Sequence, residues 1–140
     1  MSKKLLYLMC FVVVLGLAGD VAAQIDPATM TNGHVYRLGY VSDGQVLDAS
    51  ANGNNGVILG EPQLVDIPGS RALQFDGVDD GVHIPDAAGI NLSTHPDHTV
   101  IAIFNCADVS KSEKQCVYEE GGSTRGLTIY VHEGLVYAGG

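Results

Sequence analysis

Apolar and polar residues alternate in short runs along much of the chain. Turns rich in glycine, asparagine or aspartate separate these runs. Residues 34–41, 57–59, 64–67, 127–132 and 135–138 are such runs. Short alternating or β-branched runs bounded by turn residues are typical of β-strands. No ten-residue segment places its apolar residues at the helical period of 3.6, so the pattern predicts an all-β chain.

The turn Asp76-Gly-Val-Asp-Asp-Gly81 separates the two clearest alternating runs. Leu73 and Phe75 share one face of the first run, and Val82 and Ile84 share one face of the second. Glycine and aspartate tolerate positive φ and bond their own backbone, which suits them to a tight connection. We therefore predict a β-hairpin across this turn, with its apolar face buried.

The first 23 residues have the pattern of a secretory signal peptide. Lys3 and Lys4 precede an apolar run over residues 5–18, and we expect cleavage before Gln24. A membrane anchor is the alternative, but the run is shorter than the roughly 20 apolar residues that a span requires. We therefore expect a secreted or cell-surface protein, with the periplasm as another destination, and no membrane span after cleavage.

Residues 24–33 are rich in turn formers and predict a linker, which leaves residues 34–140 as one domain. The chain carries 7 lysines and arginines against 16 aspartates and glutamates, a net charge of −9. The charge becomes −10 without the signal peptide, because two lysines and one aspartate leave with it. So acidic a chain is a poor partner for a phosphate backbone, and we expect no nucleic-acid binding.

The run Thr99-Val-Ile-Ala-Ile-Phe104 is the most apolar of the mature chain and predicts a central strand. We expect Cys116-Val-Tyr118 to pair with it. Cys106 and Cys116 flank a polar segment centred on Lys111, and a hairpin about that centre would bring the two cysteines face to face. In an exported protein this predicts a Cys106–Cys116 disulfide, with two buried free thiols as the alternative.

Three blocks of sequence resemble those of a known family: residues 48–56, residues 72–85, and Asn91-Leu92 followed by Thr99-Val100, which resembles the stretch that leads into that family's next core strand. Asp48-Ala-Ser-Ala-Asn-Gly-Asn-Asn-Gly56 resembles the D-x-S-G-N-G-N-x-G loop of laminin-G-like domains, which belong to the concanavalin A-like lectin/glucanases. Residues 72–85 are similar to that family's A-L-x-F-D-G-x-D-D-x-V-x-I-P signature, and the resemblance covers about residues 34–140. It implies an antiparallel, two-sheet jelly-roll sandwich, usually a binding or adhesion module of secreted and surface proteins and often one for carbohydrate.

Three features depart from this family. Ile103 stands where tryptophan is usual, and Gly39 stands where an acidic residue is common. Such domains also usually need several more strands than residues 34–140 supply. We therefore expect a jelly roll truncated at its C-terminus, in a fragment of a longer protein with further domains. A partner that completes the sheet is the alternative.

Two loops offer the carboxylate and amide oxygens that calcium prefers. The candidate ligands are Asp48, Asn52, Asp76, Asp79 and Asp80. We predict a candidate calcium site shared between the two loops. An EF-hand is excluded, because Leu59 occupies the position of its bidentate glutamate. The alternative is that these residues only form turns and satisfy backbone donors.

Catalytic motifs are missing from the sequence. Glu119 and Glu120 are adjacent, so on a strand they point to opposite faces and cannot act as the paired carboxylates of a glycosidase. There is no Gly-x-Ser-x-Gly elbow and no phosphate loop. His95 and His98 belong to a loop, where their spacing does not converge them on zinc. We therefore expect no catalytic activity.

Tyrosines are the best candidates for a ligand surface. Tyr130 and Tyr137 flank the turn Glu133-Gly134, so we expect them to share a surface that suits sugars. Core packing is the alternative. We predict a non-catalytic module that binds a glycan or an extracellular protein. The alternatives are an N-terminal accessory domain of a larger secreted glycosidase or protease, and a purely structural domain of a large surface protein.

Overall fold

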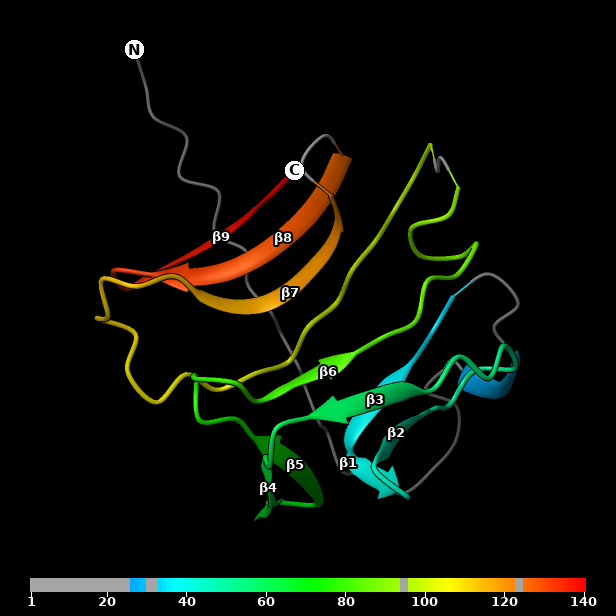
Figure 1. Ribbon diagram of the computed structural model, residues 1–140, viewed down its shortest axis with the longest axis horizontal. Coiled ribbons are helices and arrows are strands. Elements are labelled where there is room, and N and C mark those ends of the chain that lie inside the picture. Colours follow the sequence, from blue (N-terminus) through cyan, green and yellow to red (C-terminus); the bar gives the residue numbers. More distant parts are fainter. Residues whose placement is uncertain (1–25, 30–32, 94–95, 123–124) are drawn as a thin grey trace, which may run out of the picture.

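The computed structural model describes residues 26–29, 33–93, 96–122 and 125–140 (Figure 1). The predicted signal peptide, residues 1–23, lies outside these residues. Within the predicted linker, residues Pro27–Thr29 form the short 3-10 helix η1. In the described part of the chain, no helix has the length and apolar character needed to cross a membrane.

The described residues after η1 form nine antiparallel strands, so the all-β prediction is confirmed. They are β1 (Tyr36–Ser42), β2 (Gln45–Asp48), β3 (Gly56–Leu59), β4 (Gln63–Ile67), β5 (Ser70–Gln74), β6 (Gly81–His83), β7 (Gln115–Gly122), β8 (Arg125–His132) and β9 (Leu135–Gly139). They form a four-stranded sheet in the order β1-β2-β3-β6, a β4-β5 pair, and a three-stranded sheet in the order β7-β8-β9 (Figure 1).

Two tight turns join consecutive strands, and the sequence predicted the one at Glu133-Gly134. Asp43 and Gly44 join β1 to β2 with φ angles of 51° and 76°, and Glu133 and Gly134 join β8 to β9 with 48° and 79°. Positive φ at both central residues is the hairpin turn whose twist matches that of paired strands. These local connections therefore fix the register of two hairpins.

The predicted hairpin across Asp76–Gly81 is wrong. Its two runs are strands, but β5 pairs with β4, and β6 pairs with β3 in a different sheet. The two-residue connection Pro68-Gly69 brings β4 to β5, and its short loop is closed at lower entropic cost than the longer turn. Asp80 in turn accepts a hydrogen bond of 2.8 Å from the Glu61 backbone, just after β3, which holds the start of β6 beside β3.

The predicted central strand over residues 99–104 is also wrong. These residues are extended but belong to no strand, and the side chains of Ile101 and Ile103 are 83% and 89% exposed. Cys116 lies in a strand as predicted, but it pairs with Tyr130 of β8. β8 starts only three residues after β7 ends, so the pairing of these two strands closes a very short loop.

The described residues bury few apolar side chains. Those buried are Val46, Leu73 and Val131, one from each of the three sheets. Many large apolar side chains stay exposed, including most of β9. The antiparallel all-β fold is therefore established, while the closed jelly-roll sandwich stays a prediction.

Candidate binding surface

Tyr130 and Tyr137 share one face of the β7-β8-β9 sheet, as predicted. They are directly opposite each other in the β8–β9 ladder, and their rings stack with centroids 5.0 Å apart and planes 10° apart. Side chains that face each other across an antiparallel pair are close enough for such contact. The register that the Glu133-Gly134 turn fixes is what brings the two rings together.

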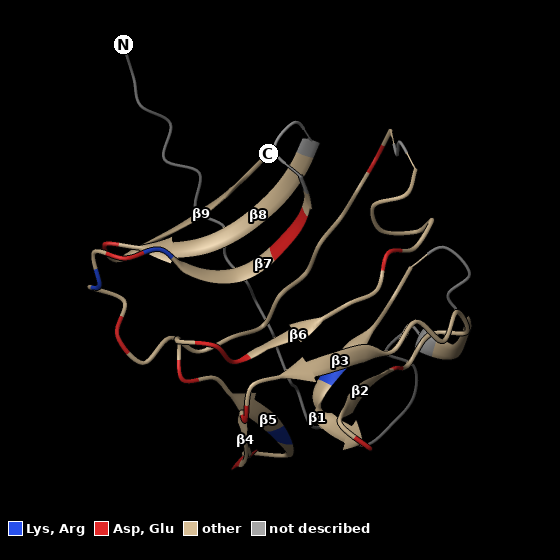
Figure 2. Ribbon diagram, viewed as in Figure 1, with Lys and Arg blue, Asp and Glu red and all other residues tan. Residues whose placement is uncertain are grey.

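A cation extends this pair into a row. Lys114 Nζ lies 4.8 Å from the centre of the Tyr130 ring, within the range of a cation–π interaction. Because Lys114 directly precedes β7, the row runs across the sheet from the β7 side to Tyr137 on the edge strand β9. Figure 2 shows how few basic residues this acidic chain has, and that the loop before β7 carries some of them. No local pattern pointed to Lys114, because it lies 16 residues from Tyr130 in the sequence.

The ring of Tyr137 keeps its outer side open to solvent. Tyr137 is 38% exposed, and His132 lies beside it with ring centroids 6.2 Å apart and planes tilted by 48°. The strand β9 pairs only with β8 among the described strands, so nothing in the sheet covers the outer face of this ring. The row therefore offers an aromatic face, two phenol groups and an ammonium group to a ligand.

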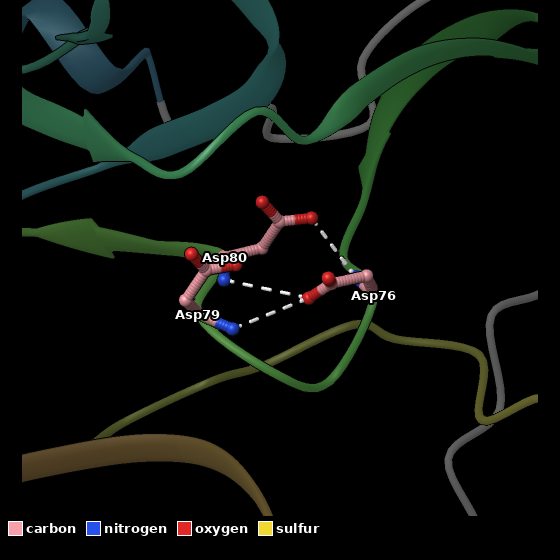
Figure 3. A group of neighbouring side chains, drawn as sticks. All are labelled: Asp76, Asp79 and Asp80. Carbon is pink, nitrogen blue, oxygen red and sulfur yellow. Dashed lines mark hydrogen bonds between the residues drawn. The ribbon is translucent and has the colours of Figure 1, made fainter.

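The acidic turn brings together three of the five predicted calcium ligands. Oxygens of Asp76, Asp79 and Asp80 lie within 4.8 Å of one another (Figure 3). Asp76 Oδ1 accepts backbone hydrogen bonds from Val78 at 2.8 Å, Asp79 at 3.4 Å and Asp80 at 3.5 Å. These bonds lower the pKa of the Asp76 carboxyl. These hydrogen bonds stabilise the turn itself, as in the alternative interpretation that the aspartates only form a turn and satisfy backbone donors.

An open hollow of about 580 Å³ lies beside this turn. Its lining residues come from the acidic turn, from the residues that follow β3 and from the β4–β5 pair; they are Gly60, Glu61, Gln63, Gln74, Phe75, Asp76, Asp79 and Asp80. Four of these side chains are carboxylates, so a ligand here would have to be cationic or bring a cation.

Asp48 and Asn52 do not join the acidic turn. Their loop precedes β3, while Asp80 contacts Glu61 just after β3, so the two loops lie at opposite ends of a strand about 13 Å long. Asn52 Nδ2 donates a hydrogen bond of 2.7 Å to the Gly33 carbonyl. The predicted sharing of one calcium ion between the two loops therefore has no geometric support.

Asp48 is instead the centre of a buried hydrogen-bond network. Its side chain is fully buried, and its oxygens lie 2.8 Å from His34 Nδ1, 2.9 Å from the Ser50 nitrogen, 3.1 Å from the Asn54 nitrogen and 3.2 Å from the Val35 nitrogen. Burial alone would raise the pKa of this carboxyl, but the hydrogen bonds from His34, Ser50 and Val35 lower it well below its usual range. Asp48 therefore stays ionised and organises its loop.

The sequence did not indicate a second polar cluster, on β7. Tyr118 donates a hydrogen bond of 2.5 Å to Glu120 Oε2, and His98 Nδ1 lies 3.3 Å from Glu120 Oε1. Burial, followed by the hydrogen bond to Glu120, raises the pKa of Tyr118. Tyr118 and Glu120 lie on one face of β7 because they are two residues apart, whereas His98 is far away in sequence.

Tyr36, on β1, is a second tyrosine with a raised pKa. Burial and the charge of Asp48 raise the pKa of Tyr36 to about 12.

Cys106 and Cys116 are free cysteines in the structure. Cys106 lies outside the strands and donates a weak hydrogen bond of 3.5 Å to Gln115 Oε1. Cys116 lies in β7, where burial and then the charge of Glu119 raise the pKa of its thiol. The strand pair expected to align the two cysteines has not formed, so their disulfide stays a prediction.

Comparison with protein-family models, curated proteins and solved structures finds no match. The laminin-G-like resemblance therefore rests on the sequence blocks themselves: the loop Asp48–Gly56, residues 72–85, and Asn91-Leu92 with Thr99-Val100.

Proposed function

We propose that this chain is a secreted or cell-surface binding module without catalytic activity, and that its ligand is a glycan. The observation that supports this proposal is the row formed by Lys114, Tyr130 and Tyr137. Sugars present apolar C–H faces that pack on aromatic rings, and hydroxyl groups that accept bonds from ammonium and phenol groups. The outer ring face of Tyr137 receives the sugar.

The jelly-roll sandwich belongs to the same proposal. It is supported by the all-β, antiparallel architecture.

Calcium dependence is a separate part of the proposal. The converging oxygens of Asp76, Asp79 and Asp80 supply part of a calcium shell, and solvent reaches them through the neighbouring hollow. Calcium takes six to eight oxygen ligands, so water or ligand hydroxyls would complete the shell. Because the turn lies in a different part of the chain from the tyrosine row, glycan binding and calcium binding can be measured independently.

The decisive experiment is a glycan array on the exported chain, with calcium and with a chelator. Glycans that bind are then measured by calorimetry with the variants Tyr137→Ala and Tyr40→Ala. Tyr40 is a matched control, because it is 53% exposed and has Arg37 5.9 Å from its ring centre, but lies on β1 in a different sheet.

We expect Tyr137→Ala to weaken binding by about tenfold or more, as for an aromatic side chain at the centre of a contact. Tyr40→Ala should leave binding unchanged. Equal losses in both variants would contradict the assigned surface, and an array without any binding would favour a purely structural role. Identical affinities with calcium and with chelator would remove calcium from the proposal.

A further inference from the structure

Two side-chain contacts hold the unpaired segment Thr99–Phe104 alongside β7. At one end His98 Nδ1 lies 3.3 Å from Glu120 Oε1, and at the other Cys106 Sγ lies 3.5 Å from Gln115 Oε1. Residue numbers rise along the segment while they fall along β7, so the two run antiparallel. Figure 1 shows this stretch between β6 and β7.

The segment has the character of a strand without its hydrogen bonds. Ile101 and Ile103 are 83% and 89% exposed, Phe104 is less exposed at 43%, and Val100 is half-buried. The backbone is extended and rich in β-branched residues, but the side chains of residues 101–105 all remain exposed. β7 is the outer strand of its sheet in the order β7-β8-β9, so the edge that faces this segment has open backbone groups.

A mismatch in length accounts for the missing ladder. His98 and Cys106 are eight residues apart, while their partners Glu120 and Gln115 are only five apart. An antiparallel ladder needs equal numbers of residues on both strands, apart from bulges. The contact between His98 and Glu120 therefore keeps the segment out of register with β7.

We propose that Thr99–Phe104 is a redox-controlled strap. With Cys106 and Cys116 reduced, it lies unpaired beside β7; a disulfide between them draws it onto β7 as a fourth strand of that sheet. Cys106 already contacts the side chain of Gln115, the neighbour of Cys116. Because successive side chains of a strand point to opposite faces, pairing with Cys116 requires Cys106 to move one residue, about 3.3 Å, along β7 and to turn to the other face of that strand.

The disulfide also selects the register. With Cys106 opposite Cys116, an unbroken ladder places Phe104 opposite Tyr118 and Ala102 opposite Glu120. His98 must then leave Glu120. The reduced and oxidised chains are thus two alternative arrangements of one segment, and a single bond biases the choice between them.

The chemistry is thiol–disulfide exchange with a disulfide oxidant, such as glutathione disulfide or a dithiol oxidoreductase. The thiolate of one cysteine attacks a sulfur of the oxidant, forms a mixed disulfide and releases one thiol. The thiolate of the second cysteine then attacks the mixed disulfide, forms the Cys106–Cys116 bond and releases the second thiol. The two cysteines lose two protons and two electrons, and the oxidant gains them as two thiols.

Amide hydrogen exchange on the exported chain tests the strap. One sample is kept in a dithiol reductant and another is equilibrated with glutathione disulfide, and free thiols are counted by mass after alkylation. We expect loss of both thiols within one chain, together with at least about tenfold slower exchange of alternate amides over residues 100–104, those whose N–H groups point toward β7. Cys106→Ser and Cys116→Ser, treated with the same oxidant, are the controls and should keep the fast exchange of the reduced chain.

Three results would overturn the strap. The thiols of the wild-type chain could both remain free in the oxidant, or bond only between two chains. The disulfide could form while exchange over residues 100–104 stays as fast as in the reduced chain. Slow exchange in either serine variant would show that the segment pairs without the bond.

Discussion

At the scale of single residues, the buried carboxylate of Asp48 has the most demanding environment in the described structure. An ionised group without water is tolerated only when hydrogen-bond donors surround it. His34 and three backbone nitrogens supply these donors and draw the N-terminal side of β1 onto the loop that follows β2. The residue that resembled a calcium ligand is therefore the anchor of its own loop.

We predict that Asp48→Asn lowers the free energy of unfolding by about 3 kcal/mol at pH 7. The asparagine side chain lacks the negative charge that the four donors stabilise. Its own NH2 group would also face one of those hydrogen-bond donors. Urea denaturation followed by circular dichroism measures the loss. The exposed Asp97→Asn is the control and should change stability by less than about 0.5 kcal/mol.

The acid dependence of stability provides a second readout of the same variant. Because the folded pKa of Asp48 is lowered, its stabilisation is fully present above the ordinary carboxyl pKa of about 4 and is lost as the pH falls below that value. The Asp48→Asn chain should therefore show a shallower loss of stability below pH 5 than the wild type. Parallel acid profiles would show that another carboxyl carries the effect.

At the scale of elements, the hairpin turns decide the register of β1–β2 and β8–β9. Gly134 has a φ of +79°, and no atom lies near the position that a side chain would occupy. Glycine is therefore required here by the backbone conformation and not by a lack of space. The tyrosine row depends on this turn, because a register slip of one residue would move Tyr137 to the other face of the sheet.

We predict that Gly134→Ala lowers the free energy of unfolding by about 1 kcal/mol, the cost of a left-handed conformation for a residue with a side chain. Gly139→Ala is the matched control: Gly139 lies in the same hairpin, its added carbon also meets no neighbour, and it lacks positive φ. This control should be neutral or slightly stabilising. Thermal or urea denaturation of the two variants gives the comparison, and equal losses would contradict the role of the turn.

At the scale of the whole molecule, exposed apolar side chains outnumber the buried ones. Val46 is completely buried in β2, whereas Ile101 and Ile103 project into solvent. Apolar burial is the main favourable contribution to folding, so stability in this structure depends on few positions. Ile101 and Ile103 belong to the extended segment beside β7, so pairing of this segment with β7 would change the environment of both side chains.

We predict that Val46→Ala lowers the free energy of unfolding by about 2 kcal/mol, because it removes buried methyl groups and leaves a cavity. Ile103→Ala removes more apolar volume but from an 89% exposed side chain, so it should cost less than about 0.5 kcal/mol in the reduced chain. Urea denaturation in a dithiol reductant measures both. A loss for Ile103→Ala as large as that for Val46→Ala would show that this segment is buried in solution.

The sequence by itself determined most strand positions and the hairpin turn at Glu133–Gly134. Alternation and turn chemistry act over a few neighbouring residues, which is why the strands around Ile58 and Leu135 and this turn could be predicted. The shared surface of Tyr130 and Tyr137 followed from the same local reasoning, since one tight turn fixes their register.

Only the tertiary structure decided which strands pair and which distant side chains meet. The alternating runs around Asp76–Gly81 look the same whether they pair with each other or with β3 and β4, because alternation specifies a face and not a partner. The approach of Lys114 to Tyr130, and of His98 to Glu120, likewise depends on how long loops close. Partner choice is set by loop-closure entropy and by competition between strand edges, and neither is contained in the local pattern of residues.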